Sequence, residues 1–300
     1  MNEIEIVEVA PRDGLQNQVT ILPTVEKLAL INRLFAAGAR RIEVASFVNP
    51  RLVPQMADAE PVLAGLGKRS GCITIGLVLN EYGLSRALRT NVDEIGMVAT
   101  ASDSFGVRNQ KQTASESVEM AKRIIVEAKV ARRRVQVTIA VAFGCPFEGE
   151  IPISRVVSMA EAIASAGPDE IALADTIGVA VPVQVTRLIR AVKDAIPRVP
   201  LRCHFHNTRN TGIANAWAAL EAGVSRLDAS VGGIGGCPFA PKATGNIATE
   251  DLVYLLHRSG VHTSYDLSAL LDLCPWLSGR LNLPELPAMV SRAGLFPVRT

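Results

Sequence analysis

Eight short apolar segments, separated by helical patterns, constrain the fold of this 300-residue chain more than any other feature. They lie at residues 4–10, 41–46, 73–79, 94–99, 135–143, 170–174, 201–206 and 226–231. Most are continuously apolar, which is typical of parallel strands buried on both faces. Eight strand and helix units predict an α/β fold, a closed (β/α)8 TIM barrel. The alternative, a doubly wound open sheet, would place a glycine-rich phosphate loop after the first strand, where Pro11-Arg12-Asp13 stands instead.

Helical patterns occupy most of the segments between these strands. The clearest run over 24–37, 115–133, 153–166, 182–196 and 210–222. Ser115 is expected to start the second of them and Pro182 the fourth, and shorter helices are predicted near 57–66 and 84–88. We expect one domain, with the barrel over about residues 1–260 and one or two further helices in a C-terminal extension over about 261–300.

Composition excludes several classes of protein. The chain is 48% hydrophobic and 20% charged with a net charge of +2, so it carries no charge bias toward nucleic acid or membrane. No apolar run approaches the roughly 20 residues that a membrane helix needs, and residues 1–5 lack the features of a signal peptide. Five widely spaced cysteines with no Cys-x-x-Cys pair argue against a disulfide framework and a structural zinc site. We therefore expect a cytoplasmic protein.

Polar residues fall where the predicted strands end, and in a barrel of this kind catalytic side chains come from those ends. The candidates are Arg12, Asp13 and Gln16 after the first strand, Glu43 in the second, Asp175 at the end of the sixth, His204 and His206 in the seventh, and Cys237 and Asn246 after the eighth.

The pair His204 and His206 is the most informative of these candidates. Residues i and i+2 of a strand project to the same face, so both imidazoles can reach one ion while Phe205 points outward to the helices. Two imidazoles together with a carboxylate and an amide oxygen suit Mg²⁺, Mn²⁺ or a similar octahedral ion. The alternative is a His-x-His pair that lines a barrel without binding anything.

Each of the remaining candidates has a structural interpretation as well. Asp13 before Gly14 is also a common turn residue, and Glu43 in an apolar strand can be half of a buried ion pair with Arg12. Asp175 can equally cap the following helical region.

The glycine-rich segment 232–238 is a candidate for a closing lid. It contains Cys237 in a Gly-Cys-Pro-Phe sequence that also occurs around Cys145, so the two thiols compete for any chemical role. The glycine-rich setting favours Cys237.

Seven segments together carry a family resemblance: 7–17 (VEVAPRDGLQN), 46–48 (SFV), 53–56 (VPQM), 144–146 (GCP), 175–179 (DTIGV), 235–238 (GGCP) and 243–254 (ATGNIATEDLVY). In these motifs the chain resembles the 3-hydroxy-3-methylglutaryl-CoA (HMG-CoA) lyases of the DRE-TIM metallolyase superfamily. The resemblance covers nearly the whole chain.

The resemblance implies a Mg²⁺- or Mn²⁺-dependent cleavage of HMG-CoA to acetyl-CoA and acetoacetate. It implies metal ligation by Asp13, His204, His206 and Asn246. Arg12 would polarise the substrate carbonyl and stabilise the thioester enolate, and Glu43 and Asp175 would support the acid/base chemistry. Cys237 would be the reactive thiol, with Cys237 or His204 as the final proton donor. Gln16 and Arg209 are predicted substrate contacts.

One segment departs from the family pattern beside the metal ligands. After the second histidine the lyases usually read Asp-Thr-Tyr-Gly-Gln, whereas this chain has Asn207-Thr208-Arg209-Asn210-Thr211. Citramalyl-CoA or a longer 3-alkyl-3-hydroxyglutaryl-CoA is therefore the competing substrate. Two competing functions are an acetyl-CoA-condensing synthase and a non-catalytic binding barrel.

The expected partner is an acyl-CoA, and neither nucleic acid nor a membrane is expected as a partner. Arg108 and Lys111 are candidate contacts for its phosphates, although solvated loop charges would look the same in the sequence. We also expect a homo-oligomer, a dimer or a tetramer.

Overall fold

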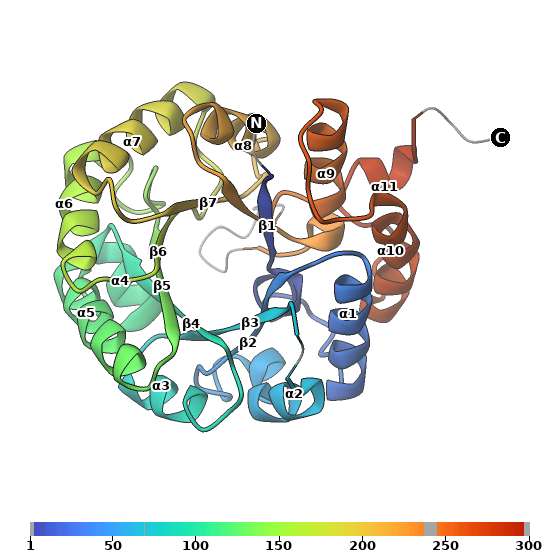
Figure 1. Cartoon of the computed structure of the whole chain (residues 1–300), viewed down its shortest axis with the longest axis horizontal. Helices are drawn as coiled ribbons and strands as arrows, with labels where there is room; N and C mark the ends of the chain where they lie inside the picture. The colour runs from blue at the N-terminus through green and yellow to red at the C-terminus, as the bar shows by residue number, and fades with distance from the viewer. Residues whose placement is uncertain (1–2, 69, 237–244, 297–300) are drawn as a thin grey trace.

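The structure, a computed structural model, describes residues 3–68, 70–236 and 245–296. Within these ranges eight parallel strands close into a barrel in the order β1 to β8, and Figure 1 shows them in a ring surrounded by helices. The strands are β1 (Glu5–Glu8), β2 (Arg41–Ser46), β3 (Ile73–Val78), β4 (Glu94–Thr100), β5 (Arg134–Ala140), β6 (Glu170–Asp175), β7 (Leu201–Phe205) and β8 (Arg226–Ala229). The predicted (β/α)8 barrel is confirmed, and the open sheet is excluded.

Helices follow the strands and cover the outside of the barrel. They are α1 (Thr24–Ala36), α2 (Ala59–Leu66), α3 (Glu81–Ala87), α4 (Asp103–Gln110), α5 (Ala114–Val130), α6 (Ile153–Ala164), α7 (Pro182–Ala195), α8 (Gly212–Glu221), α9 (Thr249–Arg258), α10 (Leu267–Leu281) and α11 (Val290–Ala293). Short turns are η1 (Ala10–Gly14), η2 (Pro54–Met56) and η3 (Val231–Gly233). The added helices α10 and α11 pack on the barrel helices α1 and α9 (Figure 1). In the described ranges no helix is long and apolar enough to cross a membrane.

Two helical predictions differ from the structure. Helix α5 starts at Ala114 rather than at Ser115, because Thr113 caps it: its hydroxyl accepts the N–H of Glu116, and the Glu116 carboxylate accepts the N–H of Thr113. Helix α4 was not predicted. It buries only Phe105 and Gly106, so its sequence carries little helical periodicity.

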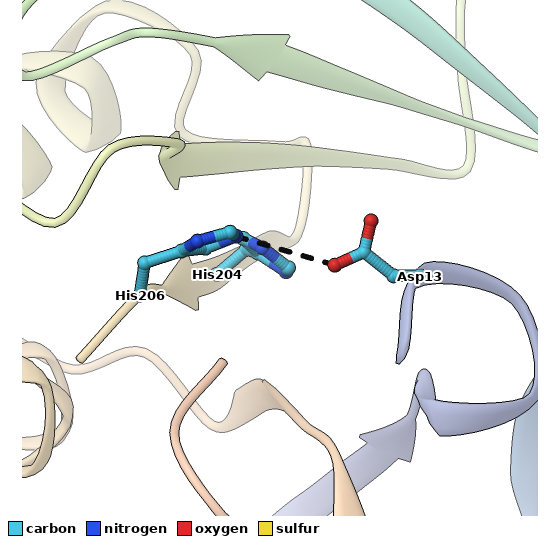
Figure 2. A group of neighbouring side chains, drawn as sticks. All are labelled: Asp13, His204 and His206. Atoms are coloured by element: carbon cyan, nitrogen blue, oxygen red, sulfur yellow. Dashed lines mark ion pairs between the residues drawn. The ribbon is translucent and has the colours of Figure 1, made fainter. Parts of the chain in front are cut away.

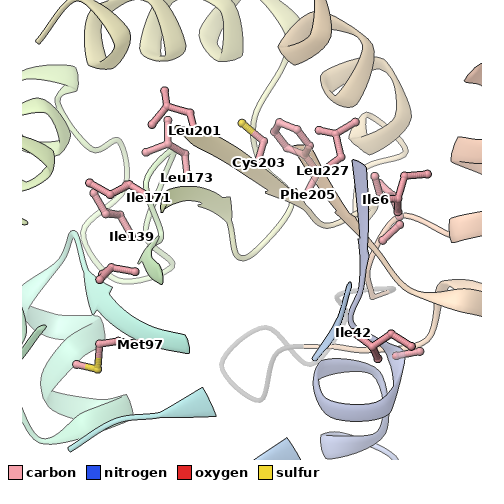
Figure 3. Packing of buried hydrophobic residues seen from close by; sticks show 14 of the residues in the cluster. Ile6, Ile42, Met97, Ile139, Ile171, Leu173, Leu201, Cys203, Phe205 and Leu227 are labelled. Atoms are coloured by element: carbon pink, nitrogen blue, oxygen red, sulfur yellow. The ribbon is translucent and has the colours of Figure 1, made fainter. Parts of the chain in front are cut away.

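The main hydrophobic core lies between the barrel and its helices. Outward-facing strand residues such as Ile42, Ile171 and Phe205 belong to one cluster with the buried faces of the helices (Figure 3). Phe205 is 1% exposed, and its placement agrees with the predicted alternation along β7. Inside the barrel, Val7, Val9 and Ile75 form a separate small cluster.

The lower end of the barrel, where the strands begin, is closed by charged side chains instead of by the usual branched apolar ones. The even-numbered strands each begin with one of four residues: Arg41, Glu94, Glu170 and Arg226. Arg41 bonds Glu94 and lies 2.9 Å from Glu170, while Arg226 lies 3.0 Å from Glu170. We call these four residues the ionic floor. Because the floor fills the N-terminal end, free space remains at the C-terminal end of the strands.

Candidate metal centre and active site

A cavity of about 530 Å³ opens at the C-terminal ends of the strands. Six of the candidates at the predicted strand ends line it: Arg12, Asp13, Gln16, Glu43, His204 and His206. Arg202 and Asp228 line its deeper part, above the ionic floor. The C-terminal face of the barrel is therefore where the candidate residues converge.

The turn after β1 brings Arg12 and Asp13 into this cavity. In η1, the carbonyl of Val9 accepts hydrogen bonds from the N–H groups of both Asp13 (2.8 Å) and Gly14 (3.2 Å). Below the turn, the buried carboxylate of Glu8 accepts the N–H of Ala10 at 2.9 Å. The turn is thus held by the backbone and by one buried acid.

His204 in β7 and His206 directly after β7 face Asp13 across the barrel. His204 and His206 have ring centroids 5.1 Å apart, and Nε2 of His206 lies 4.0 Å from Oδ2 of Asp13 (Figure 2). The possible ligand atoms of the three residues all lie within 4.8 Å of one another. The predicted cluster of two imidazoles and one carboxylate is therefore present.

Asn246 approaches this cluster from the segment that follows β8. Its backbone pairs with that of His206, which places the two side chains next to each other. The amide Nδ2 donates to Asp13 Oδ2 at 2.8 Å and to the carbonyl of Ile234 at 3.1 Å. Its Oδ1 is buried and has no hydrogen-bond partner among the described residues.

The donor set fits a divalent cation. Buried polar atoms are normally hydrogen-bonded, yet Asn246 Oδ1 and His206 Nδ1 lack partners in the described ranges. Although burial opposes ionisation, Arg12 and the two histidines lower the pKa of Asp13 to about 2. Burial and the neighbouring His204 lower the pKa of His206 to about 3. At neutral pH Asp13 is therefore a carboxylate and His206 a neutral imidazole, which are the forms that bind metal.

Arg12 is held between two carboxylates at the edge of this cluster. Nη1 lies 2.7 Å from Asp13 Oδ1 and Nη2 lies 2.7 Å from Glu43 Oε2. Burial raises the pKa of Glu43 despite the charge of Arg12. The guanidinium is thus held in the cavity by the carboxylates of Asp13 and Glu43. Between Glu43 and Ala45 the pairing of β2 with β3 shifts register, as at a β-bulge.

Asp175 and Arg209 lie outside the residues that line the cavity. Ala174 lines it, so the next residue, Asp175, is on the opposite face of β6. The Asp175 carboxylate accepts the N–H groups of Val179 (2.9 Å) and Ala180 (3.0 Å). Arg209 donates to the carbonyls of two residues in the same loop, Ile177 and Gly178. Both side chains therefore hold the loop between β6 and α7. For Asp175 this contact resembles the capping role predicted from the sequence as its structural interpretation.

Of the two competing cysteines, Cys145 lies within the described residues and Cys237 lies outside them. Cys145 is 4% exposed, does not line the cavity, and has its Sγ 2.9 Å from the hydroxyl of Ser102. Its surroundings are those of a small buried side chain.

Four buried charged residues near the site were not singled out in the sequence. Asp228 bonds His204, and Arg202 bonds Asp228. Glu8 and Glu250 accept the N–H groups of Val231 and Gly232 in the loop after β8. Strand alternation gave a usable signal for Arg202 and Asp228, because Arg202 precedes His204 by two residues and Asp228 lies at an inward position of β8.

Basic residues lie at the rim of the cavity. Arg108 and Lys111 both line it, at the end of α4. The Arg108 guanidinium lies 4.2 Å from the ring centroid of Phe147. This contact orients Arg108, one of the two cations predicted from the sequence to contact phosphate groups.

A family profile described as HMGL-like matches residues 3–275. The chain belongs to the HMGL-like family. It is 45% identical to the (R)-citramalyl-CoA lyase of Chloroflexus aurantiacus, over 98% of this chain and 96% of that protein. It is 40% identical to the 3-hydroxy-3-isohexenylglutaryl-CoA/hydroxymethylglutaryl-CoA lyase of Pseudomonas aeruginosa, over 90% of each protein. As a member of the HMGL-like family, the chain is a carbon–carbon lyase.

A solved structure from the same family has the same fold. It is an HMG-CoA lyase from Acinetobacter baumannii in complex with coenzyme A and 3-methylmalate, 40% identical to this chain with a TM-score of 0.93. The match covers 99% of this chain and 98% of that one. The fold is therefore shared with this lyase over nearly the whole of both chains.

Proposed function

We propose that this chain cleaves HMG-CoA into acetyl-CoA and acetoacetate. The observation that carries the proposal is the cluster of Asp13, His204 and His206 beside Arg12 in a single cavity. This combination suits an anionic, hydroxylated substrate whose carbon–carbon bond breaks to leave a thioester enolate.

A divalent cation, Mg²⁺ or Mn²⁺, is part of the proposal. Asp13, His204, His206 and Asn246 would hold it, since two of these side chains carry buried atoms without a partner in the described structure. When bound, it would supply a Lewis acid that orients the substrate and makes its 3-hydroxyl more acidic.

The chain's own residues are assigned as follows. Arg12 donates hydrogen bonds to the thioester oxygen as negative charge develops there, and Glu43 keeps the guanidinium oriented. The hydroxyl proton passes to a base in the cavity, for which Glu43 is the buried carboxylate with a raised pKa. Cys237 protonates the enolate carbon, because His204, the other donor that the family resemblance implies, would be engaged as a metal ligand. Asp175 supports the acid/base chemistry through the loop that it holds.

The coenzyme A portion is assigned to the rim of the cavity. Arg108 and Lys111 would contact its phosphates, and Gln16 lies on the same lining. A CoA complex of the A. baumannii lyase, a close structural match, supports an acyl-CoA substrate. A homo-oligomer, either a dimer or a tetramer, and a cytoplasmic location remain predictions, and light scattering of the purified protein tests the first.

Citramalyl-CoA is a second candidate substrate, favoured by two observations. The C. aurantiacus relative named for it shares 45% identity, and residues 207–211 depart from the usual lyase pattern. Citramalyl-CoA is shorter than HMG-CoA by one methylene before its carboxylate, so the two substrates differ in where the cavity must place that charge. A longer 3-alkyl-3-hydroxyglutaryl-CoA is a third candidate, because the P. aeruginosa relative is named for 3-hydroxy-3-isohexenylglutaryl-CoA as well as for HMG-CoA.

The deciding experiment is a panel of 3-hydroxyacyl-CoA thioesters assayed with Mg²⁺, in which mass spectrometry identifies the released ketone. Acetoacetate from HMG-CoA is the expected product. Pyruvate from citramalyl-CoA at a higher kcat/KM would replace it with the second candidate. Thiol release from acetyl-CoA and a 2-oxo acid, without lyase turnover, would indicate a synthase. Calorimetry that detects no binding of Mg²⁺ or Mn²⁺ would overturn the metal site.

A further inference from the structure

The two histidines of the candidate metal centre differ in what holds them. Nδ1 of His204 lies 3.0 Å from Oδ2 of Asp228. Nδ1 of His206 is buried and without a hydrogen-bond partner in the described ranges. Only His204 therefore has a carboxylate, among the described residues, that can select one tautomer.

Asp228 is in turn held by a chain of charges that reaches the ionic floor. Its other oxygen, Oδ1, accepts a hydrogen bond from Nη1 of Arg202, and Nε of Arg202 lies 2.8 Å from Glu170. Glu170 belongs to the ionic floor, where Arg41 and Arg226 hold it. Asp228 and Arg202 are 5% and 2% exposed, so solvent does not compete for these bonds.

We propose that Asp228, oriented by Arg202, is a positioning residue that fixes His204 as the tautomer with its proton on Nδ1. The lone pair of Nε2 is then directed into the cavity, where His204 is a lining residue. A carboxylate that accepts the second N–H of a ligating histidine fixes both its ring orientation and its tautomer. The inference deepens the proposed metal site and rests on it for its purpose.

The strand geometry explains why this carboxylate comes from β8. β7 and β8 are neighbours, and Cys203 pairs with Leu227, so the next residues along, His204 and Asp228, stand opposite each other on the inner face. Arg202 is two residues before His204 on the same face, one layer lower. Three successive contacts therefore connect the ionic floor to the imidazole: Glu170 to Arg202, Arg202 to Asp228, and Asp228 to His204.

Asp228→Asn is the test, because asparagine keeps the shape and removes the charge. Arg202 keeps Glu170 as a partner, so the variant is expected to fold. Asp169→Asn is the matched control: Asp169 is a carboxylate directly before β6 that accepts the N–H of Val135 at 2.8 Å. Thermal melts of both variants report on stability alone.

The first readout is the ring tautomer of the metal-free protein, from ¹⁵N NMR of the histidines at alkaline pH, where the imidazoles are neutral. With four histidines in the chain the spectrum can be assigned by single replacements. We expect an Nδ1-protonated His204 in the wild type and in Asp169→Asn, and a shift toward the Nε2-protonated form in Asp228→Asn. An unchanged tautomer in Asp228→Asn overturns the proposal.

The second readout is Mn²⁺ affinity, measured by electron paramagnetic resonance. Asp228→Asn should weaken it by roughly 10- to 100-fold, and Asp169→Asn should leave it unchanged. Absence of Mn²⁺ binding to the wild type would overturn the proposed function, while the tautomer would still decide the role of Asp228.

A double variant tests Arg202. Arg202→Lys should weaken Mn²⁺ binding in the same direction as Asp228→Asn, because lysine lacks the planar fork that holds both acids. If Arg202 acts through Asp228, the double variant binds about as well as Asp228→Asn alone. Losses that multiply would remove Arg202 from the assignment.

Discussion

Nη2 of Arg12 lies 2.7 Å from Oε2 of Glu43, and this buried pair sits at the edge of the candidate metal centre. The pair keeps one cation pointed into the cavity while Asp13 binds its other amino group. The guanidinium is therefore already oriented before any substrate arrives, which is the condition for efficient electrostatic stabilisation of a developing oxyanion.

Arg12→Gln should lower kcat by roughly 10²- to 10³-fold, because the donor to the thioester oxygen is lost. Metal affinity should change little, since Arg12 is not among the proposed ligands. Steady-state kinetics and Mn²⁺ binding measure the two effects. Arg123→Gln, at an exposed ion pair with Glu81, is the control. Unchanged turnover in Arg12→Gln would refute the role proposed for it.

Chelation by EDTA should abolish turnover, and Mg²⁺ or Mn²⁺ should restore it.

Asn246→Ala should weaken Mn²⁺ binding by at least about tenfold, because it removes a buried oxygen that lacks another partner in the described structure. Mn²⁺ should also raise the Tm of the wild type more than that of the variant. Asn32→Ala, on the exposed face of α1, is the control. Equal Mn²⁺ affinities in Asn246→Ala and the wild type would remove Asn246 from the ligand set.

Glu8→Gln should change how stability depends on pH. Burial raises the pKa of Glu8 from 4.5 to about 8, although it accepts hydrogen bonds from Ala10, Thr249 and Val231. Because the folded-state value is the higher one, its stabilising contribution is complete below pH 4.5 and is lost as pH rises to about 8. Glutamine resembles the protonated acid: its oxygen accepts from the backbone and its amide can donate to Thr249.

Urea unfolding across this pH range measures the effect. The wild type should lose up to about 1.4 kcal/mol per pH unit relative to Glu8→Gln. Glu119→Gln, at an exposed ion pair with Lys122, should keep the slope of the wild type. Parallel pH profiles for Glu8→Gln and the wild type would show that Glu8 ionises normally in the folded protein.

Cys237→Ala should impair turnover more than Cys145→Ala does. The Cys145 thiol is buried beside Ser102 and does not line the cavity, so its loss should act on stability. Steady-state kinetics with HMG-CoA, together with thermal melts, separate the two effects. If Cys145→Ala lowers kcat more than Cys237→Ala does, and both variants have the same Tm, the reactive thiol is Cys145.

The barrel was predictable because its signal is local and repeated. Each strand is a short apolar run, and the helices between most strands begin and end at recognisable residues such as Pro182. Helix α4 was missed because only Phe105 and Gly106 are buried in it. Its position depends on the barrel wall beneath it, which no window of sequence contains.

The site was predictable to the level of the strand ends and no further. The shared direction of His204 and His206 follows from alternation along β7 and the residue after it. Asp175 and Arg209 are near the right place in the chain, but their side chains bond backbone groups of the loop between β6 and α7. Asp228 comes from a different strand, and its contact with His204 depends on how β7 and β8 align.

The ionic floor gives the cavity a blind end. Because Arg41, Glu94, Glu170 and Arg226 close the lower end of the barrel, substrate and both products share one entrance. In the proposed binding mode the coenzyme lies at the rim and the fragment that becomes the ketone lies below it. We therefore expect acetyl-CoA to obstruct the exit of the ketone and product release to be ordered, with the larger product leaving first.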